Sequence, residues 1–305
     1  MRNAFAQEIT NLAKKNKKIV LLSGDIGNRL FDKFRNKFAN RFYNCGIAEA
    51  CMTGVSSGMA HLGLKPVTYT IATFNTIRCL EQIKLDICYP NLPVIIVGTG
   101  AGLSYASLGS THHSLDDIAL LRSIPNLTIL CPSDPEEVKK LLRDAITMKG
   151  PVYLRLGKKN EPTISHRKKI GNLDIIIDGK TNLLISVGNI IKEAIETSKK
   201  LKKNKIDNSV IDLRYIKPLD EKVIKKLFTK FKRIFIIEEH YVSGGAGSSI
   251  IEWANKNSFN SEKIHLFGAD NKFVHAGGNQ SSARDKAGLS SKKIFKKIMK
   301  IIRNR

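Results

Sequence analysis

Short apolar runs separated by longer amphipathic stretches organise the first half of the chain. The apolar positions of residues 1–16 recur at helical spacing and predict an opening helix. Continuous apolar runs predict strands at residues 18–22, 67–70, 94–97, 127–130 and 152–156. Such runs between helices are typical of parallel sheets that are covered on both faces. We therefore expect an α/β domain in this half.

Four further helices are expected between these strands, one of which begins at about Leu115. Residues 46–61 predict a helix rich in small side chains, which would let other backbones come close, and another helix is expected over residues 76–89. Asp134 precedes Pro135 and two glutamates, which is the pattern of a capped helix start.

The second half repeats the alternation after a polar, basic stretch that contains Pro162. Strands are expected at 183–187, 209–213, 234–237 and 264–267, with helices at 190–203, 220–228 and 247–257. The fold class is therefore α/β, with two consecutive open, mostly parallel sheets and helices on both faces. The predicted boundaries are a domain over 1–157, a linker over 158–172 and a domain over 173–305.

Composition narrows the class of protein. The chain has 305 residues, 42% hydrophobic and 26% charged, which is ordinary for a globular protein with two cores. It contains no apolar run long enough to cross a membrane, and its first eight residues lack the apolar core of a signal peptide. A cytoplasmic protein that binds no membrane is expected.

Five cysteines are present, and no two are spaced as a CxxC pair. This pattern argues against a disulfide framework and against a zinc site, and it fits a reducing compartment. Metal ligation by this chain alone is not expected.

The net charge of +24 is the one compositional extreme, and it raises the possibility of nucleic-acid binding. However, the lysines crowd mainly on predicted helices of the second half, and aromatic residues make up only 7% of the chain, without interleaving among the basic runs. We expect a solvated basic surface that attracts anionic substrates or an acidic partner, and no nucleic-acid binding.

Glu49 is the only carboxylate in the small-residue helix over 46–61. The positions three and four residues further on hold Met52 and Thr53, so no cation within that helix can pair with it. A buried carboxylate without a partner costs several kcal/mol or more. Either Glu49 is exposed near a helix start, where the helix dipole favours it, or its partner is a ligand.

A glycine-rich loop follows the strand at 94–97 and contains His112 and His113 just before a predicted helix. It does not match a GxGxxG or a Walker motif. The two histidines could donate to an oxygen or carry a proton near neutral pH, although a structural pair is the commoner case.

Two arginines and an aromatic residue lie within or after other predicted strands. Phe74 follows the strand at 67–70, and Arg78 lies one helical turn further, where it could pair with Glu81. Arg155 lies inside an apolar strand, so its guanidinium needs an anion or several carbonyls. In the second half, residues 236–247 combine a strand end, an acidic pair and a glycine-rich turn, which favours a tight contact between domains or subunits over a second active site.

These motifs, in this order, make the whole chain similar to the C-terminal half of transketolase, in the form found as the small subunit of split transketolases. The segments that carry the resemblance are 46–49, 109–112, 117–122, 131–134, 238–240 and 244–247. The resemblance implies a pyrimidine-binding domain followed by a transketolase C-terminal domain, and it implies thiamine diphosphate as the cofactor.

The resemblance also implies roles for individual residues. Glu49 would hydrogen-bond the aminopyrimidine of the cofactor and act in catalysis, and Phe74 would stack on that ring. His112 would hydrogen-bond the donor ketose, and Asp25 resembles an acid near the cofactor. The residues expected to reach substrate are Arg155, Arg78 and His113, with Arg155 the better candidate for a sugar phosphate.

One family motif is missing. The Gly-Asp-Gly sequence that holds the diphosphate through Mg²⁺ in this family does not occur here, and the nearest segment, Ser23-Gly24-Asp25-Ile26, has isoleucine at the third position of the motif. We therefore expect a separate, larger subunit to bind the diphosphate and the Mg²⁺. An α2β2 assembly with self-association as the central dimer follows from this.

The sequence departs from the family pattern at two places. Ser107 and Leu108 stand where transketolases usually carry an acid pair, and residues 275–280 replace the more usual acidic segment. Leucine cannot accept a hydrogen bond, so a polyol acceptor would lose about 1 to 3 kcal/mol at that contact. A more deoxygenated or modified sugar is a possible substrate.

The sequence favours transfer of a two-carbon ketol unit from a ketose phosphate to an aldehyde. Three alternatives stay open. They are another thiamine enzyme subunit, of the 1-deoxyxylulose-5-phosphate synthase or 2-oxo acid dehydrogenase beta type, a non-catalytic scaffold subunit, and a nucleic-acid binder suggested only by charge.

Overall fold

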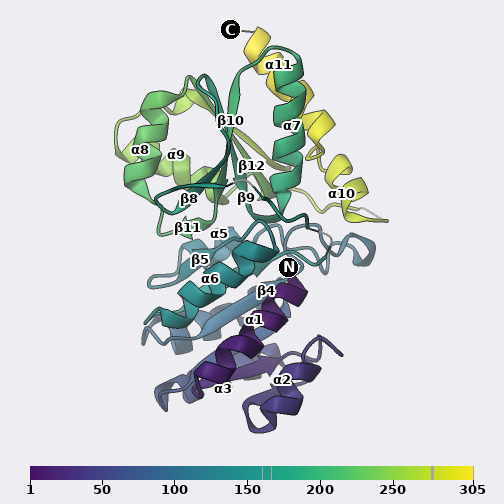
Figure 1. Ribbon diagram of the computed structural model, residues 1–305, viewed down its shortest axis with the longest axis vertical. Helices are drawn as coiled ribbons and strands as arrows, with labels where there is room; N and C mark the ends of the chain where they lie inside the picture. Colours follow the sequence, from purple (N-terminus) through teal and green to yellow (C-terminus); the bar gives the residue numbers. More distant parts are fainter. Residues whose placement is uncertain (160, 166, 276–277, 305) are drawn as a thin grey trace. The chain divides into compact units, whose positions relative to one another are not determined.

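The computed structural model describes residues 1–159, 161–165, 167–275 and 278–304. The chain forms two compact units (Figure 1). The first comprises Met1–Ala101 and Leu120–Thr163, and the second comprises Gly102–Ala119 and Ile164–Arg305. Residues 102–119 thus pack with the second unit, although the residues on both sides of them pack with the first.

The first unit is built on a parallel sheet. Its strands are β1 (Ile19–Ser23), β2 (Phe42–Asn44), β3 (Lys65–Ile71), β4 (Ile95–Thr99), β5 (Thr128–Leu130) and β6 (Val152–Leu156). They lie in the order β5-β6-β4-β3-β1-β2, and each neighbouring pair is parallel. The middle strands are buried along their whole length, as their continuous apolar runs predict.

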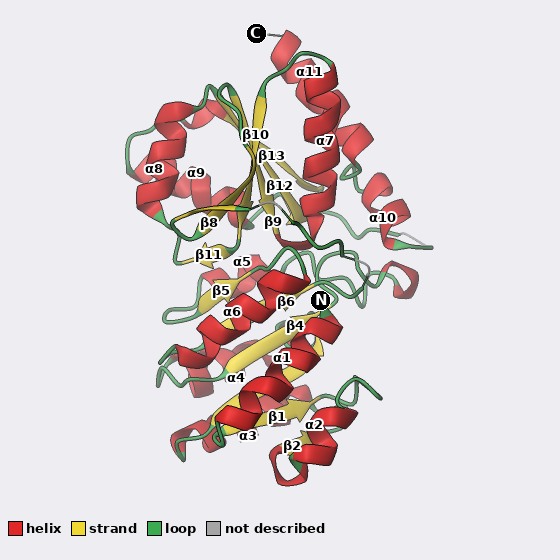
Figure 2. Ribbon diagram, in the orientation of Figure 1, coloured by secondary structure: helices red, strands yellow, loops and turns green. Residues whose placement is uncertain are grey.

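Helices connect these strands. They are α1 (Arg2–Lys15), α2 (Asp32–Lys37), α3 (Glu49–His61), α4 (Leu80–Gln82) and α6 (Pro135–Thr147). Short 3-10 segments lie at Ala39–Arg41 and Ile77–Cys79, and a π segment lies at Ile83–Cys88. In Figure 2, α1 and α6 lie in front of the sheet.

The second unit has a mixed sheet in the order β13-β12-β9-β10-β8-β7. The strands of this unit are β7 (Lys168–Ile170), β8 (Leu173–Ile177), β9 (Asn182–Val187), β10 (Asn208–Leu213), β11 (Tyr215–Lys217), β12 (Arg233–Tyr241) and β13 (Ile264–Ala269). β13, β12, β9 and β10 are parallel, whereas β8 runs antiparallel to both β10 and β7.

The main helices of the second unit are α7 (Ile191–Lys203), α8 (Glu221–Lys230), α9 (Ala246–Lys256), α10 (Gln280–Lys286) and α11 (Ser291–Arg303). Figure 2 shows α7 and α11 on one side of the sheet and α8 and α9 on the other. Short 3-10 segments lie at Ala106–Leu108, Gly188–Ile190 and Ser261–Lys263, and α5 (Asp117–Arg122) contains the return to the first unit. The predicted fold class, two mostly parallel sheets with helices, is confirmed.

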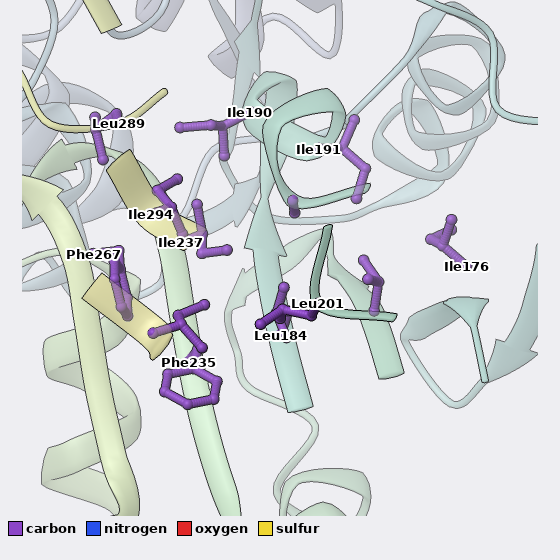
Figure 3. Packing of buried hydrophobic residues seen from close by; sticks show 13 residues of the cluster. Ile176, Leu184, Ile190, Ile191, Leu201, Phe235, Ile237, Phe267, Leu289 and Ile294 are labelled. Atoms are coloured by element: carbon purple, nitrogen blue, oxygen red, sulfur yellow. The ribbon is translucent and has the colours of Figure 1, made fainter. Parts of the chain in front are cut away.

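Apolar side chains from strands and helices form the core on one face of the second sheet (Figure 3). Leu184 on β9 and Phe235 and Ile237 on β12 face Leu201 of α7 and Ile294 of α11. All of these side chains are fully buried. The amphipathic C-terminal helix is therefore part of the domain, and most of its lysines are exposed.

Three details differ from the sequence-based expectations. The helix expected over 46–61 begins at Glu49, and the helix expected over 76–89 is divided into 3-10, α and π segments. The stretch expected as a linker contains β7, which pairs with β8 in a hairpin at the sheet edge; its residues 160 and 166 lie outside the described part of the chain. Within the described residues, we find no helix with the length and apolar character that a membrane span requires.

Candidate functional site

Glu49 is the first residue of α3 and is 1% exposed. The chain turns into the helix through Gly46, whose φ of +69° lies in the left-handed region that glycine adopts without strain. The Glu49 carboxylate therefore lies near the positive end of the helix dipole, in a buried position. This excludes the sequence-based alternative of a solvated glutamate.

The ends of two neighbouring strands form the wall beside this carboxylate. Gly24 follows β1, and a Cβ at this position would lie 3.0 Å from Thr70 Oγ1 and 3.3 Å from Glu49 Cγ. The Thr70 hydroxyl is buried and has no hydrogen-bond partner among the described residues. The absence of a side chain at Gly24 thus lets a buried acid and an unsatisfied hydroxyl approach the same point.

Arg78 is the partner of Glu49 in this structure. Its Nη1 donates to Glu49 Oε2 at 2.5 Å, and its guanidinium carbon lies 4.4 Å from the centroid of the Phe74 ring. The sequence argument that no cation pairs with Glu49 considered only its own helix, and it is corrected here. The suggested pair of Arg78 with Glu81 is not among the ion pairs of the described residues.

The Glu49 carboxylate and the Phe74 ring together accept one planar group that donates an N–H. The Arg78 guanidinium is such a group, because it donates to the carboxylate while its carbon lies over the Phe74 ring. The Arg78 side chain is 44% exposed, so it can leave this position without disrupting a core. The site therefore fits an aromatic nitrogen heterocycle such as an aminopyrimidine.

A thiol lies beside this pair. The pKa of Cys79 is raised to about 11, mainly by burial and also by the charge of Glu49, whereas a hydrogen bond with Thr53 and the charge of Arg78 lower it. Cys79 also donates to the Phe74 carbonyl at 3.3 Å. This cysteine is therefore an inert thiol that helps to hold the Phe74 backbone next to Glu49.

The remaining predicted residues of the first unit lie at other places on its sheet. Asp25 is exposed, has a φ of +52°, and accepts a hydrogen bond from Asn44 Nδ2 at 3.0 Å. Arg155 lies on β6 and is 2% exposed. The structure thus brings Glu49, Phe74 and Arg78 together, and the roles predicted for all five of these residues stay predictions.

The two predicted histidines belong to the second unit. His112 is half-buried, with its Nδ1 at 3.0 Å from Thr111 Oγ1 and its ring 6.3 Å from that of Tyr105 between centroids. Gly102 and Ser114 exchange backbone hydrogen bonds of 3.0 and 2.9 Å, and this bridge closes the loop that carries both histidines. We call residues 102–114 the histidine loop.

His113 is buried in the histidine loop. Burial lowers its pKa, while a contact with the backbone of Ala106 and the charge of Glu239 oppose this effect. Neither ring nitrogen makes a hydrogen bond of regular geometry within the described residues, so the Ala106 contact is weak. His113 is therefore neutral at pH 7 and is suited to accept or donate one hydrogen bond.

Sequence reasoning missed Gly24 and Thr70 as parts of the site. Their only signal in the sequence is their position at the ends of two apolar runs that become adjacent strands. Within the described part of the chain, no cluster of His, Cys, Asp and Glu could hold a metal ion.

Comparisons with protein families agree with this architecture. Residues 1–163 match the family model for the transketolase pyrimidine binding domain, and residues 171–294 match that for the transketolase C-terminal domain.

Relatives match the chain over nearly its whole length. The chain is 32% identical over 308 residues to one of the subunits of the apulose-4-phosphate transketolase of Phocaeicola vulgatus, covering 99% of this chain and 97% of that protein. It is 34% identical over 280 residues to the 1-deoxy-D-xylulose-5-phosphate synthase of Halothermothrix orenii, covering 90% of this chain but only 44% of that enzyme. A solved structure described as a split gene transketolase in an inactive beta4 tetramer superimposes with a TM-score of 0.86 at 29% identity, covering 98% of this chain and 97% of that one.

Proposed function

Because the chain belongs to the transketolase family, we propose that it is the small subunit of a heteromeric, thiamine-diphosphate-dependent transketolase. It would transfer a two-carbon ketol unit from a ketose phosphate to an aldehyde. The match to a single transketolase subunit covers 99% of this chain and 97% of that subunit, whereas the chain covers only 44% of the synthase. This difference supports the transketolase function over the synthase alternative.

The buried carboxylate of Glu49 next to the Phe74 ring is the observation that carries the proposal. These residues would hold the aminopyrimidine of thiamine diphosphate in the place that the Arg78 guanidinium takes here. When bound, the cofactor would supply the carbon nucleophile for the transfer. Glu49 would share a proton with a ring nitrogen at Oε2, and the protein around it would exclude water from that proton.

The other residues would bind the sugar. His112, half-buried at the turn of the histidine loop, would donate a hydrogen bond to a hydroxyl of the donor, and neutral His113 would orient it. Arg155 would pair with the phosphate, and Arg78 would turn from Glu49 toward substrate. Leu108 is 50% exposed and cannot accept a hydrogen bond, which favours an acceptor with one hydroxyl fewer at that contact.

A partner subunit completes the proposed enzyme. The sequence holds no Gly-Asp-Gly motif, so a larger subunit would bind the diphosphate and Mg²⁺. We propose an α2β2 assembly in which two copies of this chain form the central dimer.

Native mass spectrometry tests the division of the site. We expect the chain alone to retain no thiamine diphosphate in the presence of Mg²⁺, whereas the complex purified from its native cells carries two cofactors on two copies of each subunit. Cofactor bound to this chain alone would contradict the argument from the missing motif.

Replacing Glu49 tests the chemistry in the same complex. Glu49→Gln should reduce ketol transfer by about 10²- to 10³-fold, because the amide cannot share the proton. Glu81→Gln, at an exposed position on α4, is the matched control and should keep wild-type activity. Unchanged activity of Glu49→Gln would favour the scaffold alternative.

A donor screen with ketose phosphates, apulose 4-phosphate and pyruvate distinguishes the synthase and dehydrogenase alternatives.

A further inference from the structure

Glu239, on β12, is a fully buried carboxylate to which the proposed function gives no role. Its Oε1 accepts from the Leu103 backbone N–H at 2.9 Å, and its Oε2 accepts from Arg284 Nη2 at 2.5 Å. Gln280 Nε2 donates to the same carboxylate at 3.0 Å. One side chain of the sheet thus joins α10 to the start of the histidine loop.

The surroundings of Glu239 favour its ionised form. Burial opposes ionisation, but the charge and hydrogen bonds of Arg284 and the hydrogen bonds of Gln280 and Leu103 outweigh it, so the pKa of Glu239 lies below its usual value. A second set of hydrogen bonds reaches the next loop residue: Ser104 Oγ lies 3.1 Å from Gln280 Nε2 and 3.3 Å from Asn189 Nδ2.

Gly102 lies directly against this carboxylate. Its φ is +62°, and a Cβ there would lie 2.5 Å from Glu239 Cγ, closer than such atoms can approach. Glycine is therefore required at the point where the histidine loop leaves the first unit and meets Glu239.

The other end of the loop is fixed to the same strand. Beyond the bridge between Gly102 and Ser114, the Leu115 carbonyl accepts from Tyr241 N–H at 2.7 Å, and the Ala119 N–H donates to His240 Nε2 at 3.3 Å. Apolar contacts of the loop residues Leu103 and Ala106 and of the adjoining Leu115 with Ala269, Val274 and Ala283 cover the region between. His112 and His113 lie between these two fixed ends.

We propose that Glu239 is a positioning residue that sets the place of His112 and His113 by fastening the histidine loop to β12 and α10. It acts through the loop and does not touch substrate. The inference rests on the proposed function for its effect on sugar binding, but the fastening itself can be measured without activity.

The neighbouring glutamate provides a matched control. Glu238 is equally buried, at 1% exposure, but successive residues of a strand point to opposite faces. Its carboxylate accepts from the Ala246 and Gly247 N–H groups at 2.8 and 3.0 Å and so holds the start of α9. Glu238→Gln and Glu239→Gln therefore each remove one buried charge from the same strand. Glu238 contacts the start of α9, whereas Glu239 contacts the histidine loop and α10.

Hydrogen exchange of the full chain tests the fastening. In Glu239→Gln we expect amide exchange to rise about tenfold within residues 102–115, because Arg284 and Gln280 then face an amide in place of a carboxylate. Exchange around Ala246 should stay unchanged, because Glu238 still accepts its hydrogen bond. Glu238→Gln should give the reverse pattern. Gly102→Ala should loosen the loop without removing the charge, since its Cβ meets Glu239 Cγ. Exchange that stays at wild-type rates in the loop, or rises equally everywhere, would overturn the proposal.

Kinetics of the assembled complex test the positioning. We expect the KM for the donor sugar to rise about tenfold in Glu239→Gln and in Gly102→Ala, with kcat within about threefold and with cofactor occupancy unchanged by native mass spectrometry. Glu238→Gln should keep the wild-type KM. A loosened loop with an unchanged donor KM would overturn the positioning role. If the wild-type complex transfers no ketol unit, the proposed function fails, whereas the exchange data still decide whether Glu239 fastens the loop.

Discussion

At the scale of single residues, the sequence indicated that Glu49 needs a partner if it is buried, but it did not indicate which residue pairs with it. The sequence left two alternatives for Glu49, a solvated acid near a helix start or a buried acid with a ligand as its partner, and the structure shows that it is buried. Its partner, Arg78, lies 29 positions away and meets it only because two segments converge on one edge of the sheet. No periodicity within a helix encodes such a pair, so the sequence could indicate the need for a partner but not its identity.

His113 makes the stability of the folded chain depend on pH. Because burial lowers its pKa in the folded state, the unfolded chain binds the proton first as pH falls through about 6.5. The free energy of unfolding should therefore be fully retained above this pH and should decline below it, until His113 is protonated in the folded state as well. Urea unfolding at pH 7.5 and 5.5 measures the decline.

His113→Gln should reduce this pH dependence, because it removes the titrating group. His61→Gln, at an exposed position on α3, serves as the control and should leave the decline unchanged. An identical pH dependence in His113→Gln and the wild type would contradict the assignment.

At the scale of elements, capping signals were the most reliable guide. Asp134 was predicted as a cap, and its Oδ1 accepts from the Glu137 N–H at 2.8 Å at the start of α6. Glu137 in turn accepts from the Ser133 N–H at 3.2 Å. By contrast, the π segment at 83–88 and the edge strand β7 carry no local signal, because the tertiary surroundings determine them.

Asp134→Ala should destabilise the chain by about 1 to 2 kcal/mol, because the first turn of α6 loses a buried acceptor. Asp134→Asn should recover most of this, since its side-chain oxygen can accept the same hydrogen bond. Chemical denaturation measures both. Glu136→Ala removes only an exposed ion pair with Lys139 and should change stability by less than about 0.5 kcal/mol; an equal loss in both alanine variants would contradict the role of the cap.

At the scale of the whole molecule, the two-sheet architecture followed from the alternation of strands and helices. The assignment of residues 102–119 to the second unit did not follow, because the loop leaves a strand of the first unit and its apolar residues are few. Their partners, such as Ala269 and Ala283, are distant in sequence and are ordinary small residues. Only the folded structure shows that they cover the loop.

The net charge of +24 should make stability depend on salt. Like charges repel more in the compact folded state than in the unfolded chain, and added ions screen this repulsion. The melting temperature should therefore rise between about 20 and 200 mM sodium chloride. A fall over this range would indicate that attractive ion pairs dominate, and steeply salt-dependent binding to DNA or RNA would revive the nucleic-acid alternative.

The excursion of residues 102–119 constrains how this gene can recombine. A crossover placed between the two halves of the coding sequence, near residue 164, would pair a histidine loop from one ancestor with a Glu239 and an α10 from another. The loop residue at position 102 and the side chain at position 239 would then come from different parents. Any side chain at position 102 would clash with Glu239, because a Cβ there would lie 2.5 Å from Glu239 Cγ. The two halves of this chain should therefore be inherited together, and any exchange of sequence between relatives should move the loop and its anchors as one set.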